Sequence, residues 1–239
     1  MNLAFYIAFA VIIVIAVWSG YKHGLILSVA HLAAIVASLY LAALLSGAFS
    51  NEIVSGLRPF AEGYLDHQVA TEVMPKRGIS GSENLSVADA LEQQPDVAHE
   101  FCYETYRAAG IAEGPAEQMA REAQSYASAQ QTTVSDGLVQ VFCERLAYVA
   151  GTALAFILIL VLLLAVGNLP NLTFRLPEHE RLDDLGGALV GFINGLAYCT
   201  LLCWVLQFAG ALIGRDTLQH NIVANILLKL NILTIGVGI

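Results

Sequence analysis

Long apolar runs separated by short polar links dominate the hydrophobic pattern of this chain. Residues 1–21 carry no charge, and residues 24–51 carry none unless His31 is protonated. The ranges 146–174 and 186–214 are also free of charged side chains. A helix needs about 20 mostly apolar residues to cross roughly 30 Å of hydrocarbon. The pattern therefore predicts four transmembrane helices, over about residues 3–20, 24–46, 146–168 and 186–212.

The segment between the second and third apolar runs has a polar pattern with helical spacing. Val97, Phe101, Thr105 and Ala108 recur every three or four residues, as on one side of a helix. Gly114-Pro115 is a favoured helix opening, whereas Arg58-Pro59 and the stretch 75–84 predict breaks. The stretch "SDGLVQVFCERLAY" is amphipathic and leads into the third apolar run. We expect an all-helical insert over residues 47–145.

The C-terminal tail shows a third pattern. Its apolar residues recur at a spacing that places them on one side of a helix, with mostly polar residues on the other side. The last nine residues of the chain are too few to cross a membrane as a helix. The apolar positions are Leu218, Ile222, Val223, Ile226, Leu227 and Leu230. We expect an amphipathic tail helix that lies on the outer membrane surface or along the insert, or simply covers the end of the bundle.

Composition and charge are those of a membrane protein and limit the classes of partner that it can bind. The chain is 57% hydrophobic and 13% charged, whereas soluble domains contain about 25% charged residues. The insert holds fifteen Asp and Glu against six Lys and Arg, so the whole net charge of −9 resides there. This balance argues against a nucleic-acid partner. We interpret the acidic surface of the insert as a solvated face.

Basic residues in the short links predict the orientation in the membrane. Lys22 lies between the first two spans, and Arg175 and Arg181 lie between the last two. Cytoplasmic loops are enriched in Lys and Arg, so both short links are expected in the cytoplasm. Arg215 and Lys229 in the tail weaken this signal. The N-terminus, the insert and the tail are then expected outside, in a multi-pass membrane protein.

These patterns together predict an all-α integral membrane protein with four transmembrane helices and an acidic, helical, extracytoplasmic insert between helices 2 and 3. The expected organisation is a transmembrane helical hairpin over 1–46, the insert over 47–145, a second transmembrane hairpin over 146–213 and the amphipathic tail over 214–239.

Glycines recur at every turn of the last apolar run. Gly187, Gly191 and Gly195 are four residues apart, and Cys199 and Cys203 continue the same row. Glycine costs about 1 kcal/mol in an ordinary helix, but small residues let membrane helices approach closely. We expect this row to pack against another helix. The sequence does not say which helix, although packing within the chain is the simpler choice.

Other polar residues in or beside the spans can be interpreted as structural or as functional. Asp183 and Asp184 precede the fourth span, where acids cap free N–H groups and suit the helix dipole. His31 and Asn194 are predicted to lie at similar membrane depth, with Tyr198 one turn beyond Asn194. We expect His31 to be hydrogen-bonded to Asn194 or Tyr198, since unpaired polar groups are costly there. A neutral, hydrogen-bonded histidine is the simpler interpretation, and a proton relay is the alternative.

The cysteines and the sequence motifs give little indication of a catalytic or metal site. Cys102 and Cys143 fall in the insert, where a disulfide can persist if the insert lies outside; two buried thiols are the alternative. The six histidines have no metal-ligand spacing, and zinc-protease, nucleophile-elbow, P-loop and dinucleotide motifs are absent. We therefore expect no catalytic residues, no metal and no cofactor.

Two patches of the chain resemble a known family. The first is the hairpin "YKHGLILSVAHLAAIVASLYLA", and the second is "RLDDLGGALVGFINGLAYCTLLCWVL". Together they resemble the CvpA family, the colicin V production proteins of bacterial inner membranes. Family members usually carry Arg-Gly in the first turn, where this chain has His23-Gly24; Gly187 and Gly191 match better. The resemblance implies a multi-pass membrane protein linked to toxin production or export, envelope integrity and biofilm growth.

Two classes of function follow. The first is a non-enzymatic scaffold or assembly factor that works with the lipid bilayer, with further copies of itself or with other envelope membrane proteins; a receptor module cannot be separated from it by sequence. The second is a subunit of a small oligomeric transporter or channel. Transport sites usually show ionisable groups near the midplane or broken helices, and here only His31 lies within a span.

Overall fold

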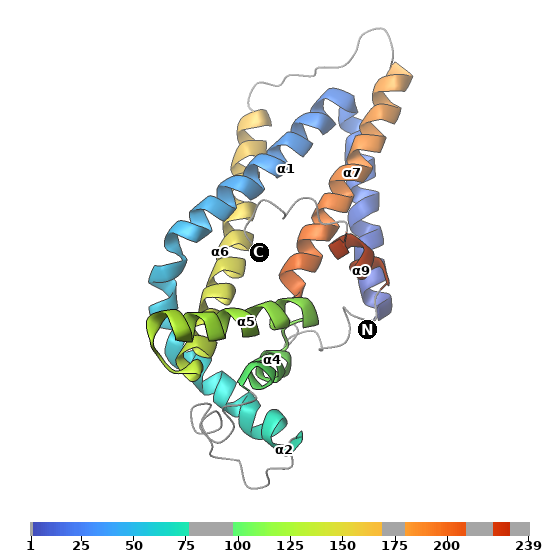
Figure 1. Cartoon of the computed structure of the whole chain (residues 1–239). Helices are drawn as coiled ribbons and strands as arrows, with labels where there is room; N and C mark the ends of the chain where they lie inside the picture. The colour runs from blue at the N-terminus through green and yellow to red at the C-terminus, as the bar shows by residue number, and fades with distance from the viewer. Residues whose placement is uncertain (1, 77–97, 169–179, 209–221, 230–239) are drawn as a thin grey trace. The chain divides into compact units, whose positions relative to one another are not determined.

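Every described element of the protein is helical. The computed structural model describes residues 2–76, 98–168, 180–208 and 222–229. The elements are α1 (Asn2–Gln68), the π-helical turn η1 (Val69–Val73), α2 (Met74–Lys76), α4 (Ala98–Ala108), α5 (Glu113–Gln130), α6 (Val134–Asn168), α7 (Glu180–Leu206) and α9 (Ile222–Lys229) (Figure 1). The expected all-α class is confirmed, and the predicted break at residues 75–84 lies largely outside the described residues.

Three of these helices contain a stretch long and apolar enough to cross a membrane. The stretches are Phe5–Ser50 in α1, Val134–Val166 in α6 and Arg181–Leu206 in α7. They overlap the apolar runs of the sequence, and they carry many exposed leucine, isoleucine and valine side chains. These features are those of a membrane protein.

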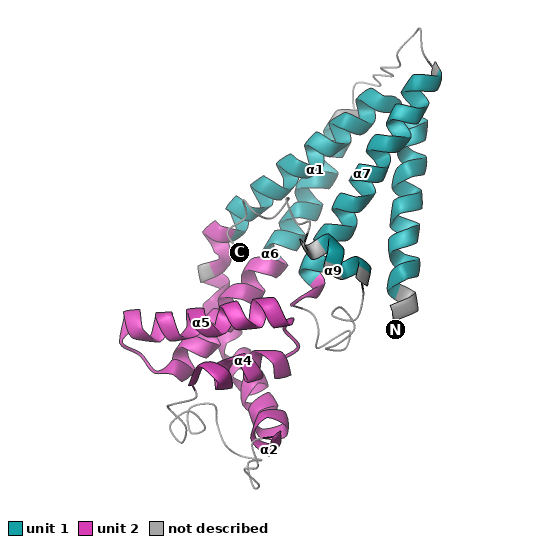
Figure 2. Ribbon diagram, turned by 45° about the vertical axis from the view of Figure 1, so that its right-hand side comes forward, with its two compact units in different colours: residues 1–46, 151–205, 217–239 teal, residues 47–150, 206–216 magenta. Residues whose placement is uncertain are grey.

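The chain divides into two compact units, drawn in different colours in Figure 2. Unit 1 comprises residues 1–46, 151–205 and 217–239, and unit 2 comprises residues 47–150 and 206–216. Helices α1 and α6 each contribute residues to both units. The contacts of each unit are therefore described separately below.

Within unit 1, α1 consists of two limbs joined at Gly24. Gly24 has φ 79° and ψ 176°, which interrupts the helix although its neighbours on both sides are helical. A positive φ of this size is favourable for glycine alone. The chain doubles back at this point (Figure 1), so that residues 2–23 form a first limb and residues 25–68 a second limb.

The boundaries of α1, α6 and α7 differ from those predicted by the apolar runs. The second limb of α1 does not end near residue 46 but continues through Pro59 to Gln68. Proline removes one hydrogen bond and strains the preceding turn; the burial of Val54, Ala61 and Leu65 on one side of this stretch offsets that cost. The predicted break at Arg58-Pro59 is therefore wrong.

Helices α6 and α7 begin earlier than their apolar runs. Helix α6 starts at Val134 and continues without interruption to Asn168, so the amphipathic stretch of the insert and the third apolar run form one helix. Helix α7 starts at Glu180 and ends at Leu206, not at residues 186 and 212, because the charged stretch before the apolar run is also helical.

Unit 2 has its own core, built by the end of α1, by α4 and α5, and by the start of α6. The rings of Tyr64 and Tyr106 stack on Phe142, with centroids 6.2 and 6.3 Å away. The Tyr106 hydroxyl donates to the Leu138 carbonyl at 2.8 Å, and the Tyr64 hydroxyl donates to the Ala109 carbonyl at 3.2 Å. As expected from their spacing, Phe101, Thr105 and Ala108 are all buried.

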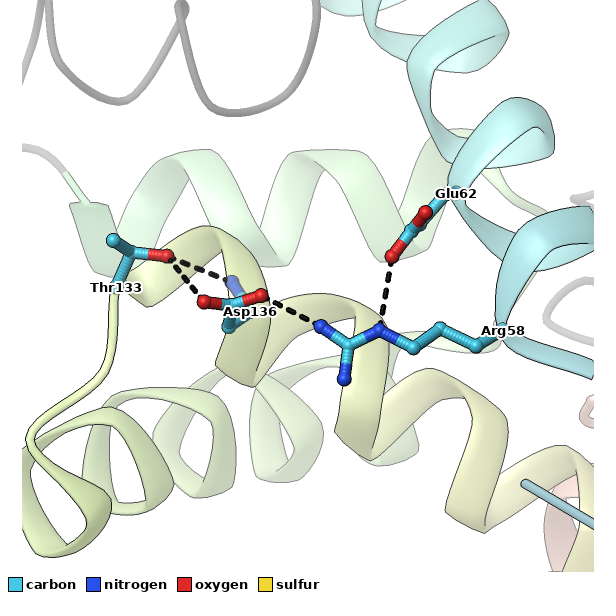
Figure 3. A network of polar contacts seen from close by, with 4 residues as sticks. All are labelled: Arg58, Glu62, Thr133 and Asp136. Carbon is cyan, nitrogen blue, oxygen red and sulfur yellow. Dashed lines mark hydrogen bonds and ion pairs between the residues drawn. The ribbon is translucent and has the colours of Figure 1, made fainter. Parts of the chain in front are cut away.

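A polar network joins α1 to the first turn of α6 (Figure 3). The Thr133 hydroxyl oxygen accepts a hydrogen bond from the Asp136 N–H at 3.2 Å and donates to the Asp136 carboxylate at 3.0 Å. Thr133 thereby caps α6. The same carboxylate accepts a hydrogen bond from Arg58 at 2.6 Å, and Arg58 also pairs with Glu62 at 2.9 Å. The network fixes where α6 begins.

The tail helix α9 has both buried and exposed apolar residues. Ala224 and Leu227 are buried, whereas Val223 and Ile226 are exposed. Exposed Val223 and Ile226 leave apolar surface on this eight-residue helix, and its expected position on the outer membrane surface or along the insert stays a prediction. Leu218 and Leu230 lie outside the described residues.

Candidate functional site

The glycines of α7 lie against the backbone of α1 in unit 1. A Cβ added to Gly191 would lie 2.5 Å from the Ala16 carbonyl oxygen, and one added to Gly195 would lie 3.1 Å from the Ile13 Cα. A Cβ on Gly187 would collide with Gly20 and Gly24. The atoms in the way at Gly187 and Gly191 are backbone atoms, which cannot rotate aside. We call this contact, made by Gly20, Gly24, Gly187, Gly191 and Gly195, the glycine seam.

The seam also shows how α7 lies on the two limbs of α1. Along the first limb, positions 13, 16, 20 and 24 approach positions 195, 191 and 187 in descending order, so this limb and α7 are antiparallel. On the second limb, Leu25 approaches Gly186 and Ser28 approaches Asn194, so this limb and α7 run in the same direction. Helix α7 is therefore packed at the turn where the two limbs meet.

Asp183 connects α7 to the beginning of the second limb. One carboxylate oxygen accepts a hydrogen bond from the backbone N–H of Leu25 at 2.8 Å, and the side chain is only 2% exposed. The N–H groups at a helix start have no partner within the helix, and a carboxylate there also meets the positive end of the dipole. Asp183 lies in the first turns of α7, not before the helix as expected, and its carboxylate caps the second limb of α1. Asp184 is half-buried in the same first turns of α7.

Asn194 makes the second polar link between the same two elements. Its side-chain amide donates to the Ser28 carbonyl at 3.2 Å. The Ser28 hydroxyl in turn donates to the Gly24 carbonyl at 2.8 Å, across the reversal of α1. Because the glycine seam brings the backbones close, the short Asn194 side chain reaches a main-chain carbonyl on its neighbour.

The predicted hydrogen bond from His31 to Asn194 or Tyr198 is absent. His31 is half-buried, and its ring meets the edge of the His23 ring with centroids 5.8 Å apart. His23 itself donates to the Ser19 carbonyl through Nδ1 at 2.7 Å. Within the described ranges, His31 and the half-buried Tyr198 make no hydrogen bond with each other or with Asn194. Ser28, less than one turn before His31, takes the role that was expected of the histidine.

Unit 1 also buries polar atoms that have no hydrogen-bond partner. Among the described residues these are the Ser38 and Thr152 hydroxyl oxygens and the Asn194 carbonyl oxygen. An unpaired buried polar group costs about 1–3 kcal/mol. The Asn194 amide is thus satisfied through its nitrogen only.

The cysteines of unit 2 are buried thiols. Cys102 and Cys143 are both free, which corresponds to the second alternative from the sequence. Burial raises the pKa of the Cys102 thiol to about 12, because a thiolate is poorly solvated in an apolar core. Burial likewise raises the pKa of the neighbouring Tyr106 hydroxyl above its ordinary value. Such thiols are weak nucleophiles.

Neither a metal centre nor a catalytic cluster emerges from the described part of the chain. No group of three His, Cys, Asp or Glu side chains is placed to hold a metal ion in those ranges. The arrangement that the structure does build is a rigid contact between helices, locked at one end by Asp183 and further along by Asn194. Sequence analysis identified the α7 half of this contact and missed Gly20 and Gly24, which have the same four-residue spacing.

Comparisons with known proteins find no counterpart for this arrangement: no family model, no curated protein and no solved structure matches the chain.

Proposed function

We propose that this protein is a four-span bacterial membrane protein of the CvpA type that acts as a non-enzymatic scaffold or assembly factor in toxin production or export and envelope maintenance. The observation that carries the proposal is the close glycine seam between the α1 hairpin and α7. A membrane bundle gains little from apolar burial between helices, and close backbone packing of small residues replaces that driving force.

The reversal at Gly24 supports two spans within α1. The apolar stretch Phe5–Ser50 has 46 residues, which as a straight helix would measure about 69 Å, more than twice the roughly 30 Å of hydrocarbon. Two limbs that meet at Gly24 fit the hydrocarbon thickness much better. With α6 and α7 they make four spans, and Lys22 beside Gly24 then favours a cytoplasmic turn.

A scaffold role fits the way in which polar groups are used. Asp183, Ser28 and Asn194 bind backbone groups of the bundle itself and hold a fixed arrangement. The resemblance of the two sequence patches to CvpA proteins is the basis for the proposed link to toxin production and the cell envelope. Under this proposal the partners are further copies of the chain or other envelope membrane proteins.

Two measurements test the proposal. Reporter fusions after residues 22, 76 and 177 should place the first and third positions in the cytoplasm and the second outside. Crosslinking in native membranes, followed by mass spectrometry, should recover envelope proteins or the chain itself. A fusion pattern with the insert inside the cell would contradict the orientation, and recovery of neither kind of partner would contradict the scaffold role.

The side-chain oxygen of Asn194 is buried without a hydrogen-bond partner. This observation favours a second candidate function, that of a subunit of a small oligomeric transporter or channel. Polar groups inside a membrane bundle often line the path of a substrate or ion. Purified protein in liposomes should then conduct ions or small solutes, and Asn194→Leu should abolish the flux. Liposomes that stay tight would eliminate this candidate and leave the scaffold.

A further inference from the structure

One exposed face of α1 is built from bulky apolar residues alternating with glycine. It consists of Phe49, Ile53, Gly56, Phe60 and Gly63, all in the part of α1 that belongs to unit 2 and all exposed. Phe60 is 79% exposed, more than any other large apolar side chain in the described ranges. At about 100° per residue these five positions fall within roughly 80° of arc. We call this surface the Phe60 face.

Nothing in the described chain explains the glycines of this face. A Cβ added to Gly56 or Gly63 would have no atom within 4 Å, whereas Gly187 and Gly191 meet backbone atoms of α1. A glycine in an exposed helix costs about 1 kcal/mol relative to alanine. Two glycines that flank an exposed phenylalanine therefore indicate room for a second helix rather than an internal contact.

The spacing of the face is that of a coiled-coil seam. The intervals between successive members are four, three, four and three residues, the alternation with which two helices pack side by side. In a parallel pair, each side chain enters a hole formed by four residues of the other helix. For Phe60 that hole would be lined by Gly56, Pro59, Phe60 and Gly63 of a second copy. Gly56 and Gly63 of the second copy would leave space for the Phe60 ring.

We propose that the Phe60 face is a dimer interface, occupied by the same face of a second copy in parallel orientation. Charge supports this orientation. In an antiparallel pair Glu52 would lie opposite Asp66 of the other copy, and like charges there are unfavourable. In a parallel pair Glu52 faces Leu57 and Asp66 faces Thr71, so like charges do not meet across this edge.

Two copies inserted the same way in one membrane are related by an axis along the membrane normal, so equivalent helices that run along the normal are parallel. The Phe60 face continues the proposed span of the second limb without a break in the helix. The inference rests on the proposed membrane spans for this point alone. The face itself is separate from the glycine seam, so either can fail without the other.

Cysteine crosslinking in membranes tests the interface directly. Equivalent positions across a parallel seam approach within disulfide range, so Phe60→Cys should give a covalent dimer on mild oxidation. Ser55→Cys is the matched control, since Ser55 is exposed and lies about 140° round the same helix. The unsubstituted chain supplies the background because its four cysteines are buried. We expect at least fivefold more dimer from Phe60→Cys; equal yields would overturn the proposal.

Association of the purified full chain provides the second test. Phe60→Ser should weaken dimerisation in detergent at least tenfold without changing thermal stability, because the side chain has few contacts within the chain. Wild-type protein that is monomeric in both detergent and membranes would overturn the inference, as would an unchanged dimer of Phe60→Ser. Protection of a Phe60→Cys monomer from water-soluble thiol reagents would assign the face to lipid instead. Resistance to carbonate extraction reports on the proposed spans independently of all these outcomes.

Discussion

The carboxylate of Asp183 accepts a hydrogen bond from the backbone N–H of Leu25, 158 residues earlier in the chain, at 2.8 Å. A residue in the first turns of α7 thus caps the second limb of α1, next to the reversal at Gly24. This bond and the glycine seam together fix the position of α7 on the α1 hairpin, and the first predictions concern them.

Asp183→Ala should lower the free energy of unfolding by about 1–2 kcal/mol, the usual range for loss of a helix cap. Asp183→Asn retains an oxygen acceptor and should lose less. Thermal or chemical unfolding in detergent measures both variants. Asp184→Ala is the control, because no hydrogen bond of Asp184 joins it to α1, and an equal loss in all three variants would contradict the cap.

Gly191→Leu should reduce the stability or abundance of the inserted protein, because even a Cβ at this position would lie 2.5 Å from a backbone oxygen. Overpacking of this kind costs about 1–3 kcal/mol or more. The matched control is Gly47→Leu, at a position where a Cβ has no neighbour within 4 Å. Equal abundance of the two variants in membranes would show that the seam does not hold the bundle together.

His31→Gln should leave both stability and function unchanged, because the His31 ring donates or accepts no hydrogen bond within the described ranges. The alternative, a proton relay through His31, requires a group that can titrate, which glutamine lacks. Complementation of a deletion strain, or the flux assay in liposomes, distinguishes the structural role of His31 from the proton relay. Loss of function in a stable His31→Gln protein would favour the relay.

Cys102 should react slowly with iodoacetamide in the folded protein and rapidly after unfolding. Its pKa is raised from 9.0 to about 12, so the folded state favours the neutral thiol. The resulting stabilisation is complete below about pH 9 and is lost as the pH rises toward about 12. The measurement is the difference in unfolding free energy between wild type and Cys102→Ala. A difference that does not shrink between pH 8 and 11 would contradict this prediction.

The sequence could predict the helices but not which helices meet. Apolar runs and three-to-four-residue spacing revealed α4, the start of α5 and the apolar parts of α1, α6 and α7, because burial and hydrogen bonding within a helix are local in sequence. The break predicted at Pro59 is wrong for a related reason. The cost of a proline is local, whereas the burial of Val54, Ala61 and Leu65 that offsets it depends on the tertiary fold.

The polar contacts were harder to predict than the glycines. The spacing of Gly187, Gly191 and Gly195 signals a close neighbour, and Gly20 and Gly24 carry the same signal in the first link. A side chain such as Asp183 has several uses at a helix start, and its choice of Leu25 depends on a reversal that only the positive φ of Gly24 permits. His31 and Asn194 do not pair: the His31 ring lies against His23, and the Asn194 amide donates to the Ser28 carbonyl.

The separation of Leu25 and Asp183 along the chain also has a consequence for biosynthesis. A ribosome adds about 5–20 residues per second, so the 158 residues between them take roughly 8 to 30 seconds to synthesise. During that interval the α1 hairpin has neither the carboxylate that caps its second limb nor the helix that covers Gly20. The nascent hairpin must therefore be sheltered, by lipid, by the insertion machinery or by a chaperone, until α7 emerges. A chain truncated before α7 would keep this surface uncovered permanently, which makes it a natural target for membrane quality-control proteases.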